Sequence, residues 1–282
     1  MLTEREIDFA ESQLNVATGP KNGSPLVLFH GLGRRWQDFG PLLADLTTRW
    51  SVTACDHRGH GRSERAASYL AVDYVSDAAH VVQLSPEPAI LIGHSLGAIV
   101  SLGVAAQVPE KVRAIVLLDP PGTGFLQAIE TTSYEAMWQA MRRLAGRSDV
   151  PETARELADL RVPSNKPGVT VRLGDLRDGT ALRFMARCLR DLDPATLNAP
   201  LEKRLLEGYD MLALARQVRC PVLLLVADPA VGGMLPPADA EPFVAAFHDC
   251  TRIDLPGIGH LVHWQNTGAT LRLLHGFLGS LP

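Results

Sequence analysis

The sequence predicts an α/β fold, in which a mostly parallel β-sheet is flanked by helices and interrupted by a helical insertion. From residue 13 to residue 113, short apolar or β-branched runs alternate with segments of helical spacing, as in parallel βαβ units. The alternation stops at about residue 125 and resumes at Pro221. One sheet whose two halves are separated by an insertion explains both the alternation of strands and helices and its interruption.

The first half of the chain contains four predicted strands and three predicted helices. The strands are expected over residues 26–29, 51–54, 89–93 and 114–118. The run over residues 26–29 is apolar at every position, which fits a strand buried on both faces. The segments between the strands predict helices over residues 36–46, 72–83 and 96–107.

The second half begins with the insertion and then returns to the βα rhythm. Residues 125–219 are rich in helical segments and arginines, and they include a polar stretch with Pro and Gly over residues 162–179. The following elements are predicted as a strand over 222–226, a helix over 238–247, a strand over 251–255 and a helix over 264–278. We therefore expect a core of residues 1–124 and 218–282, with residues 125–217 as a helical lid above the strand ends.

Composition limits the class of protein. The 282 residues carry a net charge of −4, and no basic patch suggests a nucleic-acid partner. No apolar stretch approaches the roughly 20 residues of a membrane helix, and the charged N-terminal segment lacks the apolar core of a signal peptide. The cysteines lack the spacing of a zinc site or a disulfide framework: Cys55, Cys188, Cys220 and Cys250. We expect a cytoplasmic protein without membrane insertion, for which a homodimer is left open.

The most informative motif is Gly93-His94-Ser95-Leu96-Gly97, which directly follows an apolar run. It has the form G-x-S-x-G, a sharp strand-to-helix turn that exposes a serine hydroxyl above the end of a sheet. The chain folds back so tightly there that side chains two residues either way would clash, and glycine removes the clash. The motif predicts that Ser95 is a nucleophile at a helix N-terminus, where unpaired N–H groups favour negative charge.

A serine nucleophile needs a base and preorganised donors for the negative charge that develops on a substrate carbonyl. Among nine histidines, His260 fits the base, because Gly259-His260 follows the last predicted strand at the same edge of the sheet as Ser95. The donors are expected to be the backbone N–H groups of Leu96 and of Leu32, which lies in the glycine-containing stretch after the strand over 26–29.

Together these motifs resemble the α/β-hydrolase superfamily, specifically its lidded lipase/esterase-like and dehalogenase-like branches. The resemblance covers nearly the whole chain, through His30-Gly31, the turn over residues 56–63, the elbow over residues 93–97, and Gly259-His260. It implies an eight-stranded, mostly parallel sheet, with the nucleophile and base at Ser95 and His260. Haloalkane dehalogenation is disfavoured, because that chemistry uses an aspartate where this elbow has serine.

The acid that would orient His260 departs from the common pattern. The resemblance places it three residues after a glycine that ends the strand following the lid, but the corresponding stretch here is Ala227-Asp228-Pro229-Ala230, with alanine in that slot. Some branches take the acid from the end of the preceding strand, where this chain has Asp119. We favour Asp119 and keep Asp228 as the alternative.

The expected activity is hydrolysis of a carboxylic ester or lactone of a small, apolar molecule through an acyl-enzyme, without a metal or organic cofactor. Cleavage of a C–C or amide bond on the same scaffold is an alternative, because the elbow determines a nucleophile and not a leaving group. A ligand-binding or signalling protein with slow turnover is a third. Four residues could form the substrate pocket, although such side chains also pack cores: Trp36, Met137, Trp138 and Phe184.

Overall fold

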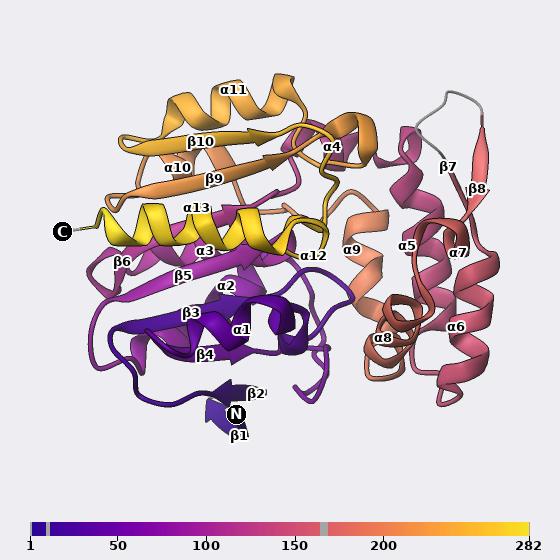
Figure 1. The fold of residues 1–282 in the computed structure, drawn as a ribbon, viewed down its shortest axis with the longest axis horizontal. Coiled ribbons are helices and arrows are strands. Elements are labelled where there is room, and N and C mark those ends of the chain that lie inside the picture. The colour runs from indigo at the N-terminus through magenta and orange to yellow at the C-terminus, as the bar shows by residue number, and fades with distance from the viewer. Residues whose placement is uncertain (1, 10–11, 164–168, 282) are drawn as a thin grey trace.

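A computed structural model describes residues 2–9, 12–163 and 169–281, and it is built around one eight-stranded sheet (Figure 1). The strands are β1 (Thr3–Phe9), β2 (Ser12–Thr18), β3 (Pro25–Phe29), β4 (Ser51–Cys55), β5 (Ala89–His94), β6 (Val112–Leu118), β9 (Val222–Ala227) and β10 (Cys250–Leu255). Their order in the sheet is β1-β2-β4-β3-β5-β6-β9-β10. The β1–β2 and β2–β4 pairs are antiparallel and the others are parallel, which confirms the predicted fold class.

Helices cover both faces of the sheet. One face packs against α1 (Gly40–Leu46) and α13 (Thr267–Gly279), and the other against α2 (Ala71–Gln83), α3 (Leu96–Gln107) and α11 (Pro237–Ala246). Successive strand residues alternate between the two cores, with Leu26 and Leu28 on one side and Val27 and Phe29 on the other. This two-sided burial explains why the central strands are apolar at nearly every position.

The segment between β6 and β9 carries most of the remaining helices. They are α4 (Thr123–Gln127), α5 (Ser133–Leu144), α6 (Val150–Asp159), α7 (Leu173–Leu176), α8 (Gly179–Arg190), α9 (Asn198–Leu201) and α10 (Met211–Ala215). In Figure 1, α5 to α8 form a group beyond one end of the sheet. Both ends of the segment return to the core, because α4 packs against α11 and α10 packs against α3.

Four local features differ from the sequence-based expectation. The β1–β2 hairpin is not among the elements expected above, and β7 (Arg161–Pro163) pairs with β8 (Thr170–Arg172) within the polar stretch of the insertion. The expected helix over 36–46 is a 3₁₀ turn, Trp36–Phe39, followed by α1, which restarts with Pro41 in its first turn. The expected helix over 264–278 is divided into α12 (Val262–Gln265) and α13, whose first turn is capped by the Asn266 side chain.

No helix in the described part of the chain combines the length and the apolar character that crossing a membrane requires.

Candidate active site

Ser95 occupies the sharp turn between β5 and α3. Its backbone has φ 55° and ψ −118°, a strained conformation for a residue with a side chain, and its N–H donates to the carbonyl of Leu118 at 3.0 Å. The flanking glycines are required by close backbone approach. A Cβ on Gly93 would lie 2.0 Å from the carbonyl oxygen of Gly97, and a Cβ on Gly97 would lie 1.8 Å from that of Phe29.

His260 follows β10 and contacts Asp119, which follows β6. The His260 Nδ1–H donates to Asp119 Oδ2 at 2.7 Å. The carboxylate is fully buried and also accepts the backbone N–H groups of Ala227 at 3.0 Å and Met234 at 2.9 Å. These neutral donors stabilise a buried negative charge, and they fix its orientation toward the imidazole.

Asp228 has a different environment. Its carboxylate accepts the backbone N–H groups of Ala230 and Gly257, and these two hydrogen bonds lower its pKa. It therefore caps a short turn after β9. Of the two candidate acids, the structure brings Asp119 to His260 and leaves Asp228 on the backbone of the neighbouring loops.

Ser95, His260 and Leu32 line one cavity of about 120 Å³. No hydrogen bond of the described residues uses the N–H of Leu32. Leu96 is the first residue of α3, where the N–H has no intrahelical acceptor. Gly31 packs directly on the nucleophile turn, because a Cβ there would lie 3.1 Å from the Ser95 Cβ. The loop after β3 and the N-terminus of α3 therefore meet beside the Ser95 side chain.

Of the four residues expected in the substrate pocket, Met137 lines this cavity. Trp36 packs instead against the core beneath α1 and α13. Trp138 belongs to the opposite core and contacts Tyr134, with ring centroids 6.2 Å apart. The Phe184 ring lies 5.7 Å from that of Trp264. The aromatic character of a helical residue therefore did not distinguish a pocket wall from core packing. The residues that line the cavity in the structure include several methionines and two arginines, Arg34 and Arg177.

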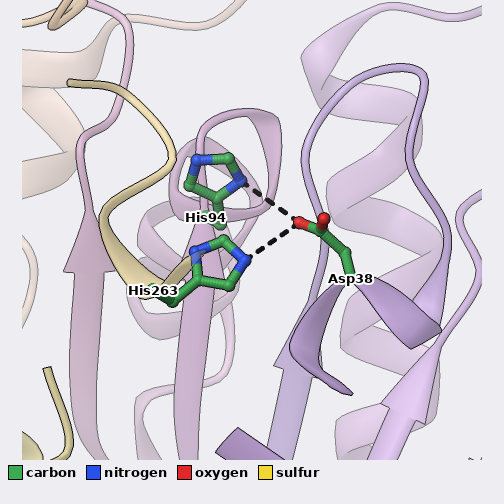
Figure 2. Close-up of side chains that lie close together, drawn as sticks. All are labelled: Asp38, His94 and His263. Atoms are coloured by element: carbon green, nitrogen blue, oxygen red, sulfur yellow. Dashed lines mark hydrogen bonds and ion pairs between the residues drawn. The ribbon is translucent and has the colours of Figure 1, made fainter. Parts of the chain in front are cut away.

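A buried cluster behind the cavity joins Asp38, His94 and His263 (Figure 2). The His94 Nε2–H donates to the backbone carbonyl of His260 at 2.9 Å, and the two rings have centroids 4.6 Å apart. The His263 Nε2–H donates to Asp38 at 3.1 Å. His94 thus supports the loop that carries His260. Its position inside the elbow motif was visible in the sequence, but its contact with a distant loop was not.

The same three residues could in principle ligate a metal ion, since one donor atom from each lies within 4.8 Å of the others. However, Asp38 already accepts hydrogen bonds from Arg34 at 2.7 Å and from the indole of Trp264. Burial alone would raise the pKa of Asp38, but Arg34 and then His263 hold it well below its usual range. A cation added here would lie close to the Arg34 guanidinium, so the cluster fits a hydrogen-bonded ion pair better than a metal site.

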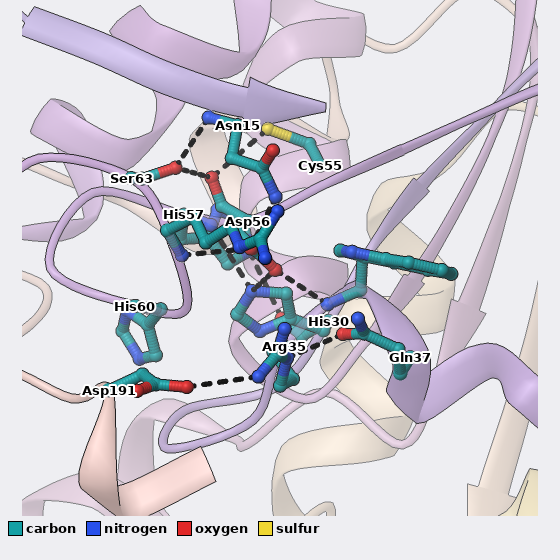
Figure 3. A network of polar contacts seen from close by, with 12 residues as sticks. Asn15, His30, Arg35, Gln37, Cys55, Asp56, His57, His60, Ser63 and Asp191 are labelled. Atoms are coloured by element: carbon teal, nitrogen blue, oxygen red, sulfur yellow. Dashed lines mark hydrogen bonds and ion pairs between the residues drawn. The ribbon is translucent and has the colours of Figure 1, made fainter. Parts of the chain in front are cut away.

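Three buried histidines hold the loop that contains Leu32 (Figure 3). His30 donates through Nδ1 to the Gly31 carbonyl at 2.8 Å and accepts the His57 backbone N–H at Nε2. His60 Nε2 accepts the Gly33 N–H at 3.1 Å. Burial is the largest effect on all three rings, and it lowers their pKa values, to about 3 for His57 and about 4 for His60. The rings are therefore neutral, and a ring nitrogen can accept a hydrogen bond.

The buried carboxylate of Asp56 connects the same loop to the rest of the fold. It accepts the backbone N–H groups of Trp36 at 2.7 Å and Arg62 at 3.1 Å, and the side-chain amide of Asn15 at 2.8 Å. Burial raises the pKa of Asp56 despite these donors. The turn over residues 56–63 is therefore a structural support for the loop after β3.

The site thus combines a serine hydroxyl, an imidazole held by a buried carboxylate, and the backbone N–H groups of Leu32 and Leu96, for which the described residues supply no acceptor. An imidazole whose Nδ1–H is engaged by a carboxylate presents Nε2 as a proton acceptor. Groups of this kind around one cavity can carry out nucleophilic attack on a carbonyl carbon and general acid–base catalysis.

Comparisons with known proteins identify relatives of this chain. A model of the alpha/beta hydrolase family matches residues 26–273. The 2-(acetamidomethylene)succinate hydrolase of Mesorhizobium japonicum is 34% identical over 209 residues, which are 68% of this chain and 72% of that protein. The 2-hydroxymuconate semialdehyde hydrolase of a Pseudomonas species is 32% identical over 158 residues, 52% of this chain and 56% of that protein.

A solved structure of E-2-(acetamidomethylene)succinate hydrolase is similar with a TM-score of 0.79 and 26% identity, and the match covers 99% of this chain and 100% of that one. The relatives are hydrolases, which supports hydrolase activity here. The chain belongs to the alpha/beta hydrolase family.

Proposed function

We propose that this protein is a serine hydrolase that cleaves a carboxylic ester or lactone of a small molecule through an acyl-enzyme. The observation that carries the proposal is that Ser95 and His260 line one cavity while Asp119 holds the opposite side of the His260 ring. The helices between β6 and β9 would act as a lid, since Tyr134, Met137 and Met185 from this segment line the cavity that contains Ser95.

In the acylation step, the Ser95 Oγ attacks the carbonyl carbon and its proton passes to His260 Nε2. The bond to the leaving oxygen then breaks, and the same proton moves from His260 to that oxygen. In deacylation, water gives a proton to His260 and attacks the acyl carbon, and the proton returns to Ser95 as the acid is released. Asp119 remains ionised and stabilises the imidazolium that forms twice in the cycle.

The N–H groups of Leu32 and Leu96 would bind the oxygen that becomes negatively charged in both steps. Backbone donors fixed before the reaction need no reorganisation when the charge develops, and loss of one such donor costs about 10²–10³ in kcat in related sites. The histidine-supported loop after β3 and the first turn of α3 supply this rigidity.

The test is turnover of p-nitrophenyl acetate together with intact-mass spectrometry of the protein exposed to a panel of esters and lactones. We expect an acyl adduct on the wild-type protein and on a Ser280→Ala control, and none on Ser95→Ala. Turnover by Ser95→Ala within tenfold of the wild type would overturn the assignment of the nucleophile. A panel that gives neither turnover nor adduct would favour a ligand-binding role.

An amide substrate is the second candidate, and the similarity to 2-(acetamidomethylene)succinate hydrolase favours it, because that name contains an acetamido group. The same residues would serve, with His260 giving its proton to the leaving nitrogen. The two candidates are distinguished by the ratio of the kcat/KM values for an ester and an amide that share the same acyl group.

A further inference from the structure

Among the described residues, Arg177 is a cation without an ion-pair partner in the wall of the cavity that contains Ser95. It follows α7 and lines both the cavity that contains Ser95 and an adjoining cavity of about 540 Å³. Within the described part of the chain, no hydrogen bond or ion pair involves its guanidinium. Its neighbour Asp178 cannot be counted as a dedicated partner, because the Asp178 carboxylate caps α8 by accepting the Ala181 N–H at 2.8 Å.

The second cation of the cavity, Arg34, is already neutralised. Its guanidinium donates to the buried Asp38 through Nε and lies within 2.7 Å of the same carboxylate through Nη2. It also lies over the Phe184 ring, 5.1 Å from the centroid. These contacts fix Arg34 in place, whereas no described residue forms a hydrogen bond or ion pair with the Arg177 guanidinium, and Asp178 only partly offsets its charge.

The electrostatic environment of Arg177 is therefore unfavourable in the absence of a ligand. Burial and then the positive charge of Arg34 lower its pKa, and the smaller opposing effects of Tyr134 and Asp178 do not restore it. None of the described residues that line either cavity is an aspartate or a glutamate. Most of the remaining wall is apolar, including Met137, Leu173 and Met234. An unpaired arginine in such surroundings costs free energy that an anion would recover.

We propose that Arg177 binds a carboxylate of the substrate, so that this hydrolase acts on acyl compounds that carry a free carboxylate near the bond to be cleaved. The inference rests on the proposed function of Ser95 and names its substrate class. A planar guanidinium matches the two oxygens of a carboxylate in a bidentate pair. The apolar side chains that line the cavity together with Arg177 and Ser95 would hold the carbon chain that joins the carboxylate to the acyl group.

The first test measures binding without turnover. In a Ser95→Ala protein, isothermal titration with succinate and with its neutral diamide should show a preference for the dianion. Adding Arg177→Gln should raise the Kd for succinate by about 10- to 100-fold, the value of a charge-assisted pair. Arg177→Lys, which keeps the charge but lacks the planar guanidinium for a bidentate pair, should give an intermediate Kd. Arg183→Gln removes an exposed arginine of α8 and should leave the Kd unchanged.

The second test compares the p-nitrophenyl monoester of succinic acid with p-nitrophenyl acetate. The ratio of their kcat/KM values should fall at least tenfold in Arg177→Gln and stay unchanged in Arg183→Gln. A smaller fall, or a succinate Kd that does not respond to Arg177→Gln, would overturn the carboxylate site. Failure of the proposed function would give a different result. Turnover would then persist in Ser95→Ala, while Arg177→Gln would still raise the Kd for succinate.

Discussion

Asp119 combines a left-handed backbone with a fully buried carboxylate. Its φ is 46°, a conformation that aspartate tolerates better than most residues, and its N–H donates to the Leu225 carbonyl at 2.8 Å. Such strain persists only where surrounding contacts determine the conformation. Here the contacts are two backbone donors and His260, all directed at one carboxylate. The residue is thus held where it can orient the imidazole.

Asp119→Asn should lower the rate of single-turnover acylation of Ser95 by about 10³–10⁴, because an amide can donate to His260 and stabilise the wrong tautomer. Asp228→Asn is the matched control. Its amide oxygen can still accept the Ala230 N–H, and the lost bond to Gly257 does not involve the Asp119–His260 pair, so its rate should stay close to that of the wild type. Stopped-flow release of p-nitrophenol measures both. If Asp228→Asn were the slow variant, the choice of acid would be reversed.

The sequence could predict Ser95 and His260 because each has a local signal, a glycine-flanked elbow and a histidine after a strand. It left two aspartates open, because chain spacing does not tell which carboxylate faces the ring. His94 and Arg177 could not be identified in this way. Their surroundings are made by the loop of His260 and by a cavity wall assembled from separate segments of the insertion.

At the level of elements, the β5–α3 turn depends on the absence of two side chains. The Gly97 position lies against the backbone of β3, which cannot move without disturbing the sheet. The helices and strands of the core were predictable because burial imposes a clear period on them. The β1–β2 and β7–β8 hairpins were not. β1 is mostly exposed, β7 and β8 have only three residues each, and the buried stretch of β2 includes the polar Asn15.

Gly97→Ala should destabilise the protein by about 1–3 kcal/mol or more, since the new Cβ would lie 1.8 Å from the Phe29 carbonyl oxygen. It should also reduce ester turnover, because the displaced turn carries Ser95. Gly276→Ala in α13 is the control. Its Cβ meets nothing within 4 Å, so it should stabilise the helix by about 0.5–1 kcal/mol. Urea unfolding measures both, and equal stability of the two variants would contradict the close-approach argument.

For the whole molecule, sheet order assembles the site. Leu32, Ser95, Asp119 and His260 follow β3, β5, β6 and β10, and parallel strands bring their carboxyl ends to one edge. The sequence indicated this edge because each residue lies at the end of a strand or in the loop that follows it. The packing of the insertion across it follows from contacts between distant helices, and so only its helical character was predictable.

The buried histidines make global stability depend on pH. His30, His57 and His60 are neutral in the folded protein because burial lowers their pKa values, whereas in the unfolded chain they titrate near 6.5. Below that pH the unfolded state binds more protons, so the free energy of unfolding falls as pH decreases. For His60 the loss runs from about pH 6.5 to its folded pKa of about 4.

His60→Gln should reduce this pH dependence, because the glutamine oxygen can accept the Gly33 N–H without titrating. The slope of unfolding free energy against pH between 6.5 and 4.5 should decrease by up to about 1.4 kcal/mol per pH unit, the contribution of one proton. His248→Gln, at an exposed position, should keep the wild-type slope. Urea unfolding at half-unit pH intervals gives the slopes. A His60→Gln slope equal to that of the wild type would mean that His60 is protonated in the folded protein, and the acceptor role assigned to its Nε2 would then be wrong.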